Sequence, residues 1–277
     1  MEHQDNRAAR QAWDGIAQGY DRYVTPTHFW LGGEGLSRAG LRAGMRFLDV
    51  AAGSGALSIP AARLGAHVVA TDQSEPMLGL LSERARRDGL DIETRIMDGH
   101  ALQLESNSFD LAGSQFGVML FPDMPKGISE MVRVVKPGGR VLMTVYGHPA
   151  KIEFFGFFIT AIQSVRPEFT GPPLEPPPLP FQLQDPAKLR HELARAGLND
   201  IEVETVTETL EFGDGQKLWD WLVWSNPIVE TVLGSLNLTN AERSTIIKAL
   251  DGLVQERAGS EAVAKLTNPI NIGIGTK

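Results

Sequence analysis

Short apolar runs alternate with segments of helical periodicity between residues 41 and 147. The apolar runs have the length of buried strands, which we expect at Arg46–Val50, His67–Thr71, Ile92–Met97, Phe109–Gln115 and Arg140–Tyr146. Helices are expected at Ala56–Leu64, after the N-cap residue Ser74, and at Ile128–Val135, ahead of a helix breaker at 136–139. Apolar strands that alternate with helices form parallel sheets covered on both faces. The pattern predicts a doubly wound α/β domain.

The rhythm changes after Gly147. Phe154–Ile162 has the pattern of an aromatic-rich helix, and Gly171–Phe181 contains six prolines, which exclude a helix interior or a central strand. The later elements expected are helices at 185–197 and 239–258 and strands at Ile201–Phe212 and Asn268–Gly275. The sheet is therefore expected to resume near the end of the chain, with irregular material between its later strands.

Composition and charge narrow the function classes. The chain has 277 residues, 42% hydrophobic and 22% charged, as in globular proteins. Acidic residues outnumber basic ones, 34 to 26, and this balance opposes binding to nucleic acid or an anionic membrane. Without cysteine, no thiolate can act as nucleophile or metal ligand. The start of the chain is polar, and the longest apolar stretch is far short of the ~20 residues that span a bilayer. We expect a cytoplasmic protein without membrane insertion.

A glycine-rich turn follows the first expected strand. Small residues at Gly53 and Gly55 let the backbone turn sharply and approach a ligand closely. The second strand ends in Asp72, an acid that can accept hydrogen bonds from both ribose hydroxyls of a nucleoside. This pair of features also fits a NAD enzyme, although Ser58 stands where the third glycine of such a fingerprint is expected. A plain tight turn is the remaining interpretation.

A second acid separates these interpretations. Asp98 follows the third strand and is expected at the same carboxyl edge of the sheet, where open α/β sheets bind ligands. A carboxylate there can accept a hydrogen bond from an adenine amino group. Asp98 therefore favours a nucleoside ligand whose base lies beyond the second strand.

The runs LDVAAGSG, ATDQSEPML, MDGHA, FDLAGSQFG and VKPGGR occur in this order. They resemble the class I S-adenosylmethionine-dependent methyltransferases, above all the small-molecule branch with the ubiquinone and menaquinone C-methyltransferases (the type 11 domain). The likeness covers roughly residues 13–146, about half of the chain. It implies a Rossmann-like, mostly parallel sheet of seven strands with helices on both faces, an N-terminal lid and a helical cap inserted between late strands.

The expected division follows from the resemblance and the pattern together. It places lid helices at 1–35, the cofactor-binding core at 36–148, a Pro-rich insert at 149–184, the return of the core sheet at 185–212 and 268–277, and the helical cap at 213–267.

The resemblance also implies the cofactor-binding residues. They are Tyr20, Asp49, Ala51, Gly53, Gly55, Asp72, Gln73, Met77, Asp98, Gly99, His100 and Gln115. Within this set Asp49 would hold the methionyl ammonium, Asp72 the ribose and Asp98 the adenine amino group. The family usually has glycine at the position of Ala51, and we expect an alanine there only with a negative φ.

The segment from Trp13 to Asp21 resembles the helix and loop that close over the cofactor in this branch. Tyr20 would then lie beside the sulfonium, whose positive charge favours aromatic faces. The alternative is that Trp13 and Tyr20 only anchor the helix to the core.

Candidates for contact with the acceptor are less specific. The six histidines show no metal-ligand spacing, so no metal is expected, and His28, His100 and His148 are the candidate general bases. Aromatic residues of the second half, joined by Trp30, are expected either to roof an apolar acceptor or to pack in the core. They are Trp30, Trp219, Trp221, Trp224, Phe154, Phe155, Phe157 and Phe158.

The function expected is the transfer of a methyl group from S-adenosyl-L-methionine to carbon, oxygen or nitrogen of a small apolar or aromatic acceptor, with S-adenosyl-L-homocysteine as product. The displacement needs alignment and exclusion of water more than a catalytic triad. A non-catalytic S-adenosylmethionine-binding protein and, less favoured, a NAD-dependent oxidoreductase are the alternatives. The Pro-rich arm and the aromatic content are compatible with a homodimer.

Overall fold

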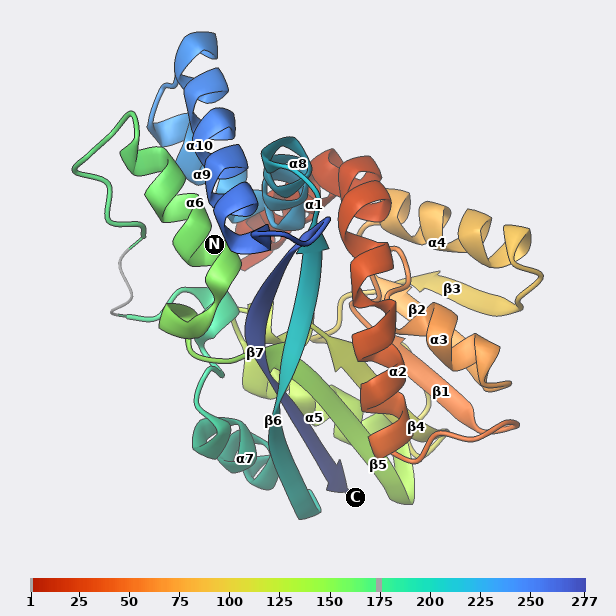
Figure 1. Ribbon diagram of the computed structural model, residues 1–277. Helices are drawn as coiled ribbons and strands as arrows, with labels where there is room; N and C mark the ends of the chain where they lie inside the picture. The colour runs from red at the N-terminus through yellow and green to blue at the C-terminus, as the bar shows by residue number, and fades with distance from the viewer. Residues whose placement is uncertain (1, 173–175) are drawn as a thin grey trace.

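The computed structural model describes residues 2–172 and 176–277. Seven strands form one sheet in the order β3-β2-β1-β4-β5-β7-β6 (Figure 1). Their bounds are β1 Arg46–Val50, β2 His67–Asp72, β3 Ile92–Ile96, β4 Phe109–Gln115, β5 Val135–Tyr146, β6 Asn199–Phe212 and β7 Ala264–Thr276. Strands β1 to β5 pair in parallel, whereas β7 lies antiparallel between β5 and β6. The predicted seven-stranded, mostly parallel sheet is confirmed.

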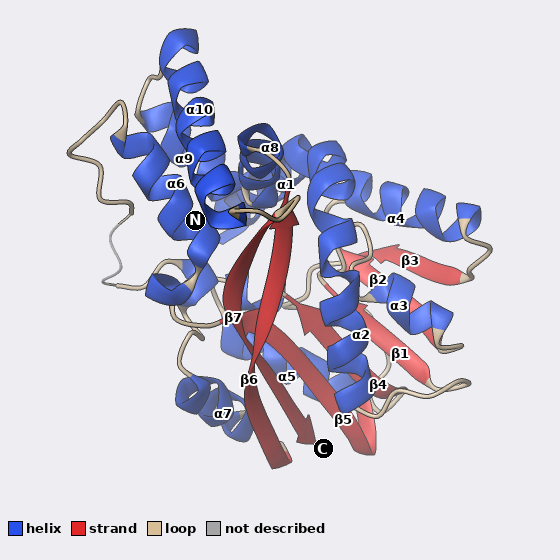
Figure 2. Ribbon diagram, in the orientation of Figure 1, coloured by secondary structure: helices blue, strands red, loops and turns tan. Residues whose placement is uncertain are grey.

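Helices cover both faces of this sheet (Figure 2). One face carries α2 (Phe29–Arg38), α3 (Ser58–Arg63) and α4 (Glu75–Arg87), and the other carries α5 (Met124–Val134) and α7 (Pro186–Arg195). Two of these helices, α4 and α7, begin after the N-cap residues that the sequence predicts. The Ser74 hydroxyl accepts a hydrogen bond from Met77 N at 3.3 Å, and the Asp185 carboxylate accepts one from Ala187 N at 2.8 Å.

The main core lies between the sheet and these helices. Side chains of the central strands, such as Phe47, Leu48 and Leu142, are fully buried. Each such aliphatic or aromatic side chain contributes roughly 1.5–3 kcal/mol through removal of apolar surface from water. This core fixes β1, β2 and β4 rigidly, and with them the strand ends that carry polar residues.

A second hydrophobic core holds a helical cap beyond one end of the sheet (Figure 1). The cap consists of α6 (Glu153–Gln163), α8 (Gly215–Ser225), α9 (Pro227–Ser235) and α10 (Asn240–Ala258), together with the adjoining ends of β6 and β7. Trp221, Ile246 and Leu250 are buried at its centre. Helices α8 to α10 are inserted between β6 and β7, where the sequence predicts a helical cap, whereas α6 lies between β5 and β6 in the part predicted as the Pro-rich insert.

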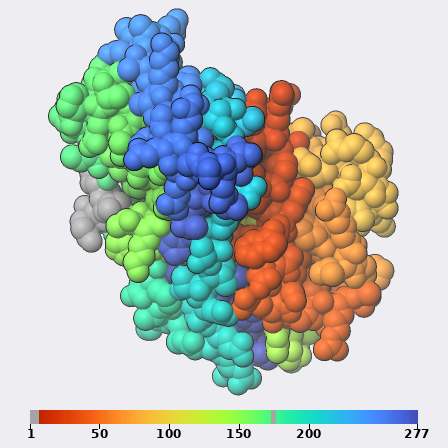
Figure 3. Space-filling model, viewed as in Figure 1, coloured from red at the N-terminus to blue at the C-terminus, as the bar shows by residue number. Residues whose placement is uncertain are grey.

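The N-terminal segment lies between the cap and the helices of the sheet (Figure 3). It runs through α1 (Glu2–Gly19), a π-helical turn η1 (Tyr20–Val24) and a 3₁₀ turn η2 (Thr25–His28) into α2. Gly19 lies so close to α8 that a Cβ there would collide with the Trp224 ring. The other 3₁₀ turns are η3 (Val118–Leu120), η4 (Pro149–Lys151) and η5 (Leu179–Phe181).

Several element boundaries differ from the sequence-based expectations. Helix α3 begins at Ser58 rather than at 56, because the glycine turn extends to Leu57. The expected helix breaker at 136–139 instead lies inside β5, where the register shifts between Phe109 and Leu111. At this irregularity the backbone N–H of Gly138 donates a hydrogen bond to the carbonyl of Lys277.

Strand β7 also begins earlier than expected, at Ala264, because its first residues pair with the apolar end of β6. Residues 173–175 of the expected Pro-rich extended segment lie outside the described residues. None of the described helices combines the length and the apolar composition needed to cross a membrane. The division into lid, core, insert and cap stays a prediction.

Helix α10 offers a test of the cap's stability. Thr239 Oγ1 accepts from Glu242 N at 3.2 Å, and Glu242 Oε2 accepts from Thr239 N at 2.8 Å. Thr239→Ala removes half of this capping box, so we expect a loss of about 1 kcal/mol in the free energy of unfolding, measured by urea titration. Thr245→Ala, at an exposed position in the middle of the same helix, is the control and should change stability by less than about 0.5 kcal/mol. Equal losses of stability in the two variants would contradict the role of the capping box.

Candidate functional site

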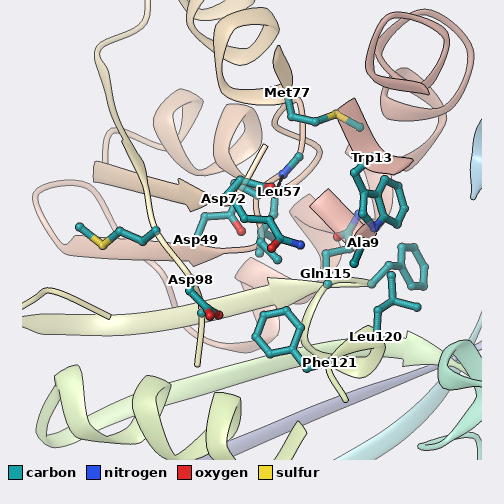
Figure 4. A pocket seen from close by; sticks show the side chains of 18 of the residues that line it. Ala9, Trp13, Asp49, Leu57, Asp72, Met77, Asp98, Gln115, Leu120 and Phe121 are labelled. Carbon is teal, nitrogen blue, oxygen red and sulfur yellow. Dashed lines mark hydrogen bonds between the residues drawn. The ribbon is translucent and has the colours of Figure 1, made fainter. Parts of the chain in front are cut away.

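A cluster of polar residues lies at the carboxyl ends of the parallel strands. Asp49 comes from β1, Asp72 from the end of β2, Asp98 from the turn after β3 and Gln115 from the end of β4. They line a pocket that encloses about 960 Å³ of space free of atoms, its open mouth included. Figure 4 shows the three carboxylates on one side of the pocket, with Trp13 of α1 across from them.

Most of the residues expected to bind a cofactor meet here. The pocket is lined by Tyr20, Asp49, Ala51, Gly53, Asp72, Gln73, Met77, Asp98, Gly99, His100 and Gln115. Gly55 does not line it, because the backbone of this residue turns behind the pocket wall against Leu81 of α4. What each residue binds stays a prediction at this point.

Asp49 is buried and only half satisfied. Its Oδ2 accepts a hydrogen bond of 2.5 Å from the Ser58 hydroxyl, whereas Oδ1 has no hydrogen-bond partner among the described residues. Burial raises the pKa of Asp49 to about 7, although the hydrogen bond from Ser58 works in the opposite direction. The serine that replaces the third glycine thus orients this carboxylate, and one oxygen is left for a donor in the pocket.

Asp72 is held by the backbone of the glycine turn and of α4. Its Oδ2 accepts from Gly53 N and its Oδ1 from Ser74 N, both at 2.9 Å. Burial nevertheless raises the pKa of this carboxyl above its ordinary value. The two backbone donors fix the orientation of the side chain, and a carboxylate with two oxygens has lone pairs left for a ligand.

Asp98 and His100 form the far end of the pocket. Asp98 Oδ1 accepts from His100 N at 2.9 Å and lies 2.7 Å from His100 Nδ1. The imidazole ring packs on Phe121, with ring centroids 4.4 Å apart. A flat apolar surface next to a carboxylate is suited to an aromatic base with an amino group.

The expectation of a negative φ at Ala51 is wrong. Ala51 has φ +56°, in the left-handed region where a Cβ is unfavourable. The tight turn from β1 into the glycine loop requires this backbone, which the hydrogen bond from Ala52 N to Thr71 O at 3.0 Å holds in place. Gly117 makes room, because a Cβ there would fall 2.5 Å from the Cβ of Ala51.

The N-terminal segment forms one wall of the pocket. Trp13 and Tyr20 both line it, and their rings meet edge to face with centroids 5.8 Å apart. An ion pair of 2.5 Å between Asp21 and Arg84 ties the turn after α1 to α4. The segment therefore lies beside the pocket and is anchored to the core, and the role of Trp13 and Tyr20 in a lid stays a prediction.

The three candidate bases lie in different surroundings. His100 lines the pocket at the Asp98 end. His28 is buried behind Phe116, with ring centroids 5.0 Å apart, and burial lowers its pKa to about 4. His148 is exposed and outside the pocket, where its Nδ1 accepts from Ala150 N at 3.2 Å and caps η4.

None of the eight aromatic residues considered for an acceptor roof lines this pocket. Trp219, Trp221 and Phe158 are buried in the cap core, so core packing explains them. Trp30 is 58% exposed on α2 and borders a separate surface groove.

Several pocket residues are missing from the sequence-based set. They are Ala9, Ala52, Ala56, Leu57, Met97, Phe116, Gly117, Leu120, Phe121 and Pro122. Five of them follow β4 directly, in the run FGVMLFP. The signal available was position alone, since a loop after the carboxyl end of a central parallel strand lies at the ligand-binding edge.

Comparison with known proteins agrees with this geometry. Residues 48–143 match the family model described as a methyltransferase domain. The matched part of the chain contains most of β1, all of β2 to β4, most of β5 and the three pocket carboxylates, and the resemblance to methyltransferases read from the sequence motifs is confirmed.

Relatives match about half of the chain. An uncharacterised protein of Mycobacterium tuberculosis is 37% identical over 136 residues, 49% of this chain and 48% of that protein. The demethylmenaquinone methyltransferase of Clavibacter sepedonicus is 36% identical over 143 residues, 50% of this chain and 57% of that protein. The alignment thus spans about half the length of the relatives that the chain matches.

Among solved structures, phosphoethanolamine N-methyltransferase 2 of Haemonchus contortus, in complex with phosphomonomethylethanolamine and S-adenosylhomocysteine, superposes with a TM-score of 0.52 at 21% identity. The match covers 95% of this chain and 60% of that one. The likeness in fold thus extends over most of this chain, beyond residues 48–143.

The left-handed backbone of Ala51 generates a stability prediction. Ala51→Gly should raise the free energy of unfolding by roughly 0.5–1 kcal/mol, because relief of the strained φ outweighs the added freedom of the unfolded chain. Ala52→Gly, at the next position, which is buried and has no positive φ, should instead lower the free energy of unfolding by roughly 0.4–1 kcal/mol. Urea unfolding of both variants tests this pair, and the same sign in both would refute the strain at Ala51.

Proposed function

We propose that this protein is an S-adenosylmethionine-dependent methyltransferase that acts on a small apolar or aromatic acceptor. The observation that carries the proposal is the set of three carboxylates, Asp49, Asp72 and Asp98, at the ends of three neighbouring strands within a methyltransferase domain. Because β1, β2 and β3 are neighbours in the sheet, the three carboxylates follow the order of the ammonium, ribose and adenine amino groups along the cofactor.

The residues present fit S-adenosylmethionine. The unpartnered Oδ1 of Asp49 is suited to the methionyl ammonium, and Asp72 to the two ribose hydroxyls. The adenine ring would lie against Phe121, with its amino group toward Asp98. Tyr20 and Gln115 line the remaining end, to which we assign the methyl group.

The cofactor, when bound, supplies a methyl group on a sulfonium, and an acceptor nucleophile attacks this methyl carbon in line with the sulfur that leaves. The residues of the chain then have to orient the cofactor and the acceptor and to exclude water. Trp13 and Tyr20 close one side of the pocket, and Phe116 forms an apolar wall at the Gln115 end. We assign His100 to the adenine end because of its contact with Asp98, and not to proton transfer.

The charge of the pocket separates this proposal from a NAD-dependent oxidoreductase. Neither lysine nor arginine is among the described residues that line it, while three carboxylates are. A dinucleotide would bring its anionic pyrophosphate next to these acids, whereas S-adenosylmethionine brings an ammonium and a sulfonium. The electrostatics support the methyl donor.

The first test compares the two cofactors by thermal shift. At one hundred times its dissociation constant, S-adenosylhomocysteine should stabilise the protein by roughly 2.7 kcal/mol, a shift of several degrees, and NAD should give none. Asp98→Ala should weaken or abolish the shift, and Asp91→Ala, at an exposed position of the loop before β3, is the matched control. Stabilisation by NAD alone would overturn the proposal in favour of hydride transfer.

A second test uses the pKa of Asp49. Because burial raises this pKa to about 7, the carboxyl is neutral below that pH and cannot pair with an ammonium. The affinity for S-adenosylhomocysteine should therefore be greatest above pH 7 and fall by up to about tenfold per unit below it. Calorimetric titration at several pH values measures this dependence. Asp49→Asn should weaken binding at high pH and flatten the profile, and an unchanged slope would exclude Asp49 as the ammonium ligand.

A further inference from the structure

A second hollow lies between α2 and α3, which are neighbours on one face of the sheet (Figure 1). It encloses about 1090 Å³ of space free of atoms, its open mouth included, and this size allows a small organic molecule. No described residue lines both this hollow and the pocket at the strand ends. We call it the outer groove, and its lining includes Trp30, Gly33, Leu41, Arg42, Arg63 and Leu64.

Exposed apolar side chains gather at the outer groove. Trp30 of α2 is 58% exposed, and Leu64, which follows α3, is 45% exposed. The other large hydrophobic side chains that the described chain exposes are on β3, η5 and α9, and they are Ile96, Leu179 and Ile228. Two exposed side chains cover little of the roughly 800 Å² per partner that a stable protein complex buries. Their surface therefore suits a small molecule better than a protein interface.

Helix α2 has a glycine at the outer groove that the packing of the described chain does not require. Gly33 lies in the middle of the helix, and a Cβ there would have no atom of the described chain within 4 Å. The neighbouring Gly32 is different, because a Cβ there would fall 2.5 Å from the carbonyl oxygen of Ala56. Glycine in a helix interior lowers stability relative to alanine. At Gly33 the missing side chain instead keeps the groove deep, as is typical where a ligand approaches the backbone closely.

The charged residues among those described in the lining of the outer groove are both arginines. The Arg42 side chain is exposed and has no hydrogen-bond or ion-pair partner among the described residues. Arg63 donates from Nη2 to Asp88 Oδ2 at 2.7 Å, and its guanidinium lies 5.6 Å from the centroid of the Phe29 ring. Because a guanidinium carries five N–H donors, Arg63 keeps donors for a ligand.

The outer groove and the pocket differ in the sign of their charge. Three carboxylates line the pocket, and neither lysine nor arginine is among its described lining residues. The described lining of the groove holds arginine and no carboxylate, although acidic residues outnumber basic ones, 34 to 26, in the chain. An anion is therefore repelled by the pocket and attracted by the groove. The two sites can hold ligands of opposite charge without competition.

We infer that the outer groove binds a small amphiphilic anion. Its apolar body lies against Trp30 and Leu64 and over Gly33. Its carboxylate, sulfonate or phosphate group pairs with Arg42, and Arg63 supplies further donors. The flat face of an indole favours a ring or an unsaturated chain in that body. The inference does not rest on the proposed function, because the groove and the pocket share no described lining residue.

The test uses two dyes with one ring system. 8-Anilinonaphthalene-1-sulfonate carries a sulfonate, N-phenyl-1-naphthylamine is the same molecule without it, and the fluorescence of both rises on apolar surfaces. Gly33→Leu fills the groove and should weaken the binding of both dyes at least about tenfold. Gly79→Leu, at an exposed position of α4 where a Cβ also meets no atom within 4 Å, is the matched control and should leave both dissociation constants unchanged.

The melting temperatures of the two leucine variants show that they are folded. Both should equal or exceed that of the wild type, because leucine is a better helix former than glycine. Equal dye affinity in the wild type and Gly33→Leu would place the dyes elsewhere on the protein and overturn the inference. A wild type that binds neither dye overturns it as well.

A second pair of variants tests the charge. Arg42→Gln should weaken binding of the sulfonated dye at least about threefold and leave binding of the uncharged dye unchanged, because the sulfonate alone interacts with the guanidinium. Arg86→Gln removes the same charge from an exposed position of α4 outside the groove and should change neither constant. An equal effect of the two substitutions would mean a general influence of protein charge and would contradict an anion site at Arg42.

Gel filtration tests whether a second copy of the chain covers the groove instead. We expect Trp30→Ser to elute at the same volume as the wild type, because Trp30 contacts a small ligand and not another protein chain. A wild-type dimer that Trp30→Ser converts to a monomer would assign the groove to the second copy and overturn the inference.

Discussion

The parallel pairing of β1 with β2 on one side and β4 on the other decides where the polar groups of the pocket lie. Phe47, Leu48 and Val50 of β1 are fully buried, so this strand cannot slide or turn without loss of the main core. Parallel strands end at the same edge, and each strand here ends at or next to a polar residue. The apolar core thus positions Asp49, Asp72 and Gln115 without any direct bond between them.

The same arrangement makes the site costly to build, since Asp49 is buried at the end of a hydrophobic strand. Ser58 and the glycine turn offset part of that cost, with a hydroxyl for Asp49 and a backbone N–H for Asp72. The left-handed backbone of Ala51 adds to it. At this edge Asp49 Oδ1 has no partner among the described residues, and Ala51 and Phe116 both have a positive φ. Strained backbone next to an unpaired polar atom is typical of a binding site.

The sheet and its carboxylates could be predicted because their signals are local. Each pocket acid follows an apolar run of strand length, and the strand Phe109–Gln115 agrees with β4 to the residue. The positive φ of Ala51 could not be predicted from the sequence. It depends on Gly117, a residue distant in sequence that leaves room for the Cβ of Ala51. His28 and Asn268 are likewise brought together only by the fold. The burial of Glu208 could be predicted, because residues two apart in a strand share a face, and Glu208 therefore shares the inward face of β6 with Leu210 and Phe212.

The two large cores leave the N-terminal segment as the part that can open most easily. Its own apolar contacts form a small separate cluster around Ile16, Ala17 and Met77, and the ion pair of Asp21 with Arg84 adds one polar link. Because local opening costs least where little apolar surface is buried, α1 can leave the pocket while the sheet and cap stay folded. His28, at the end of this segment, is held by Gln115 and the cap. Opening of α1 alone would therefore leave the contact of His28 with Glu208 in place.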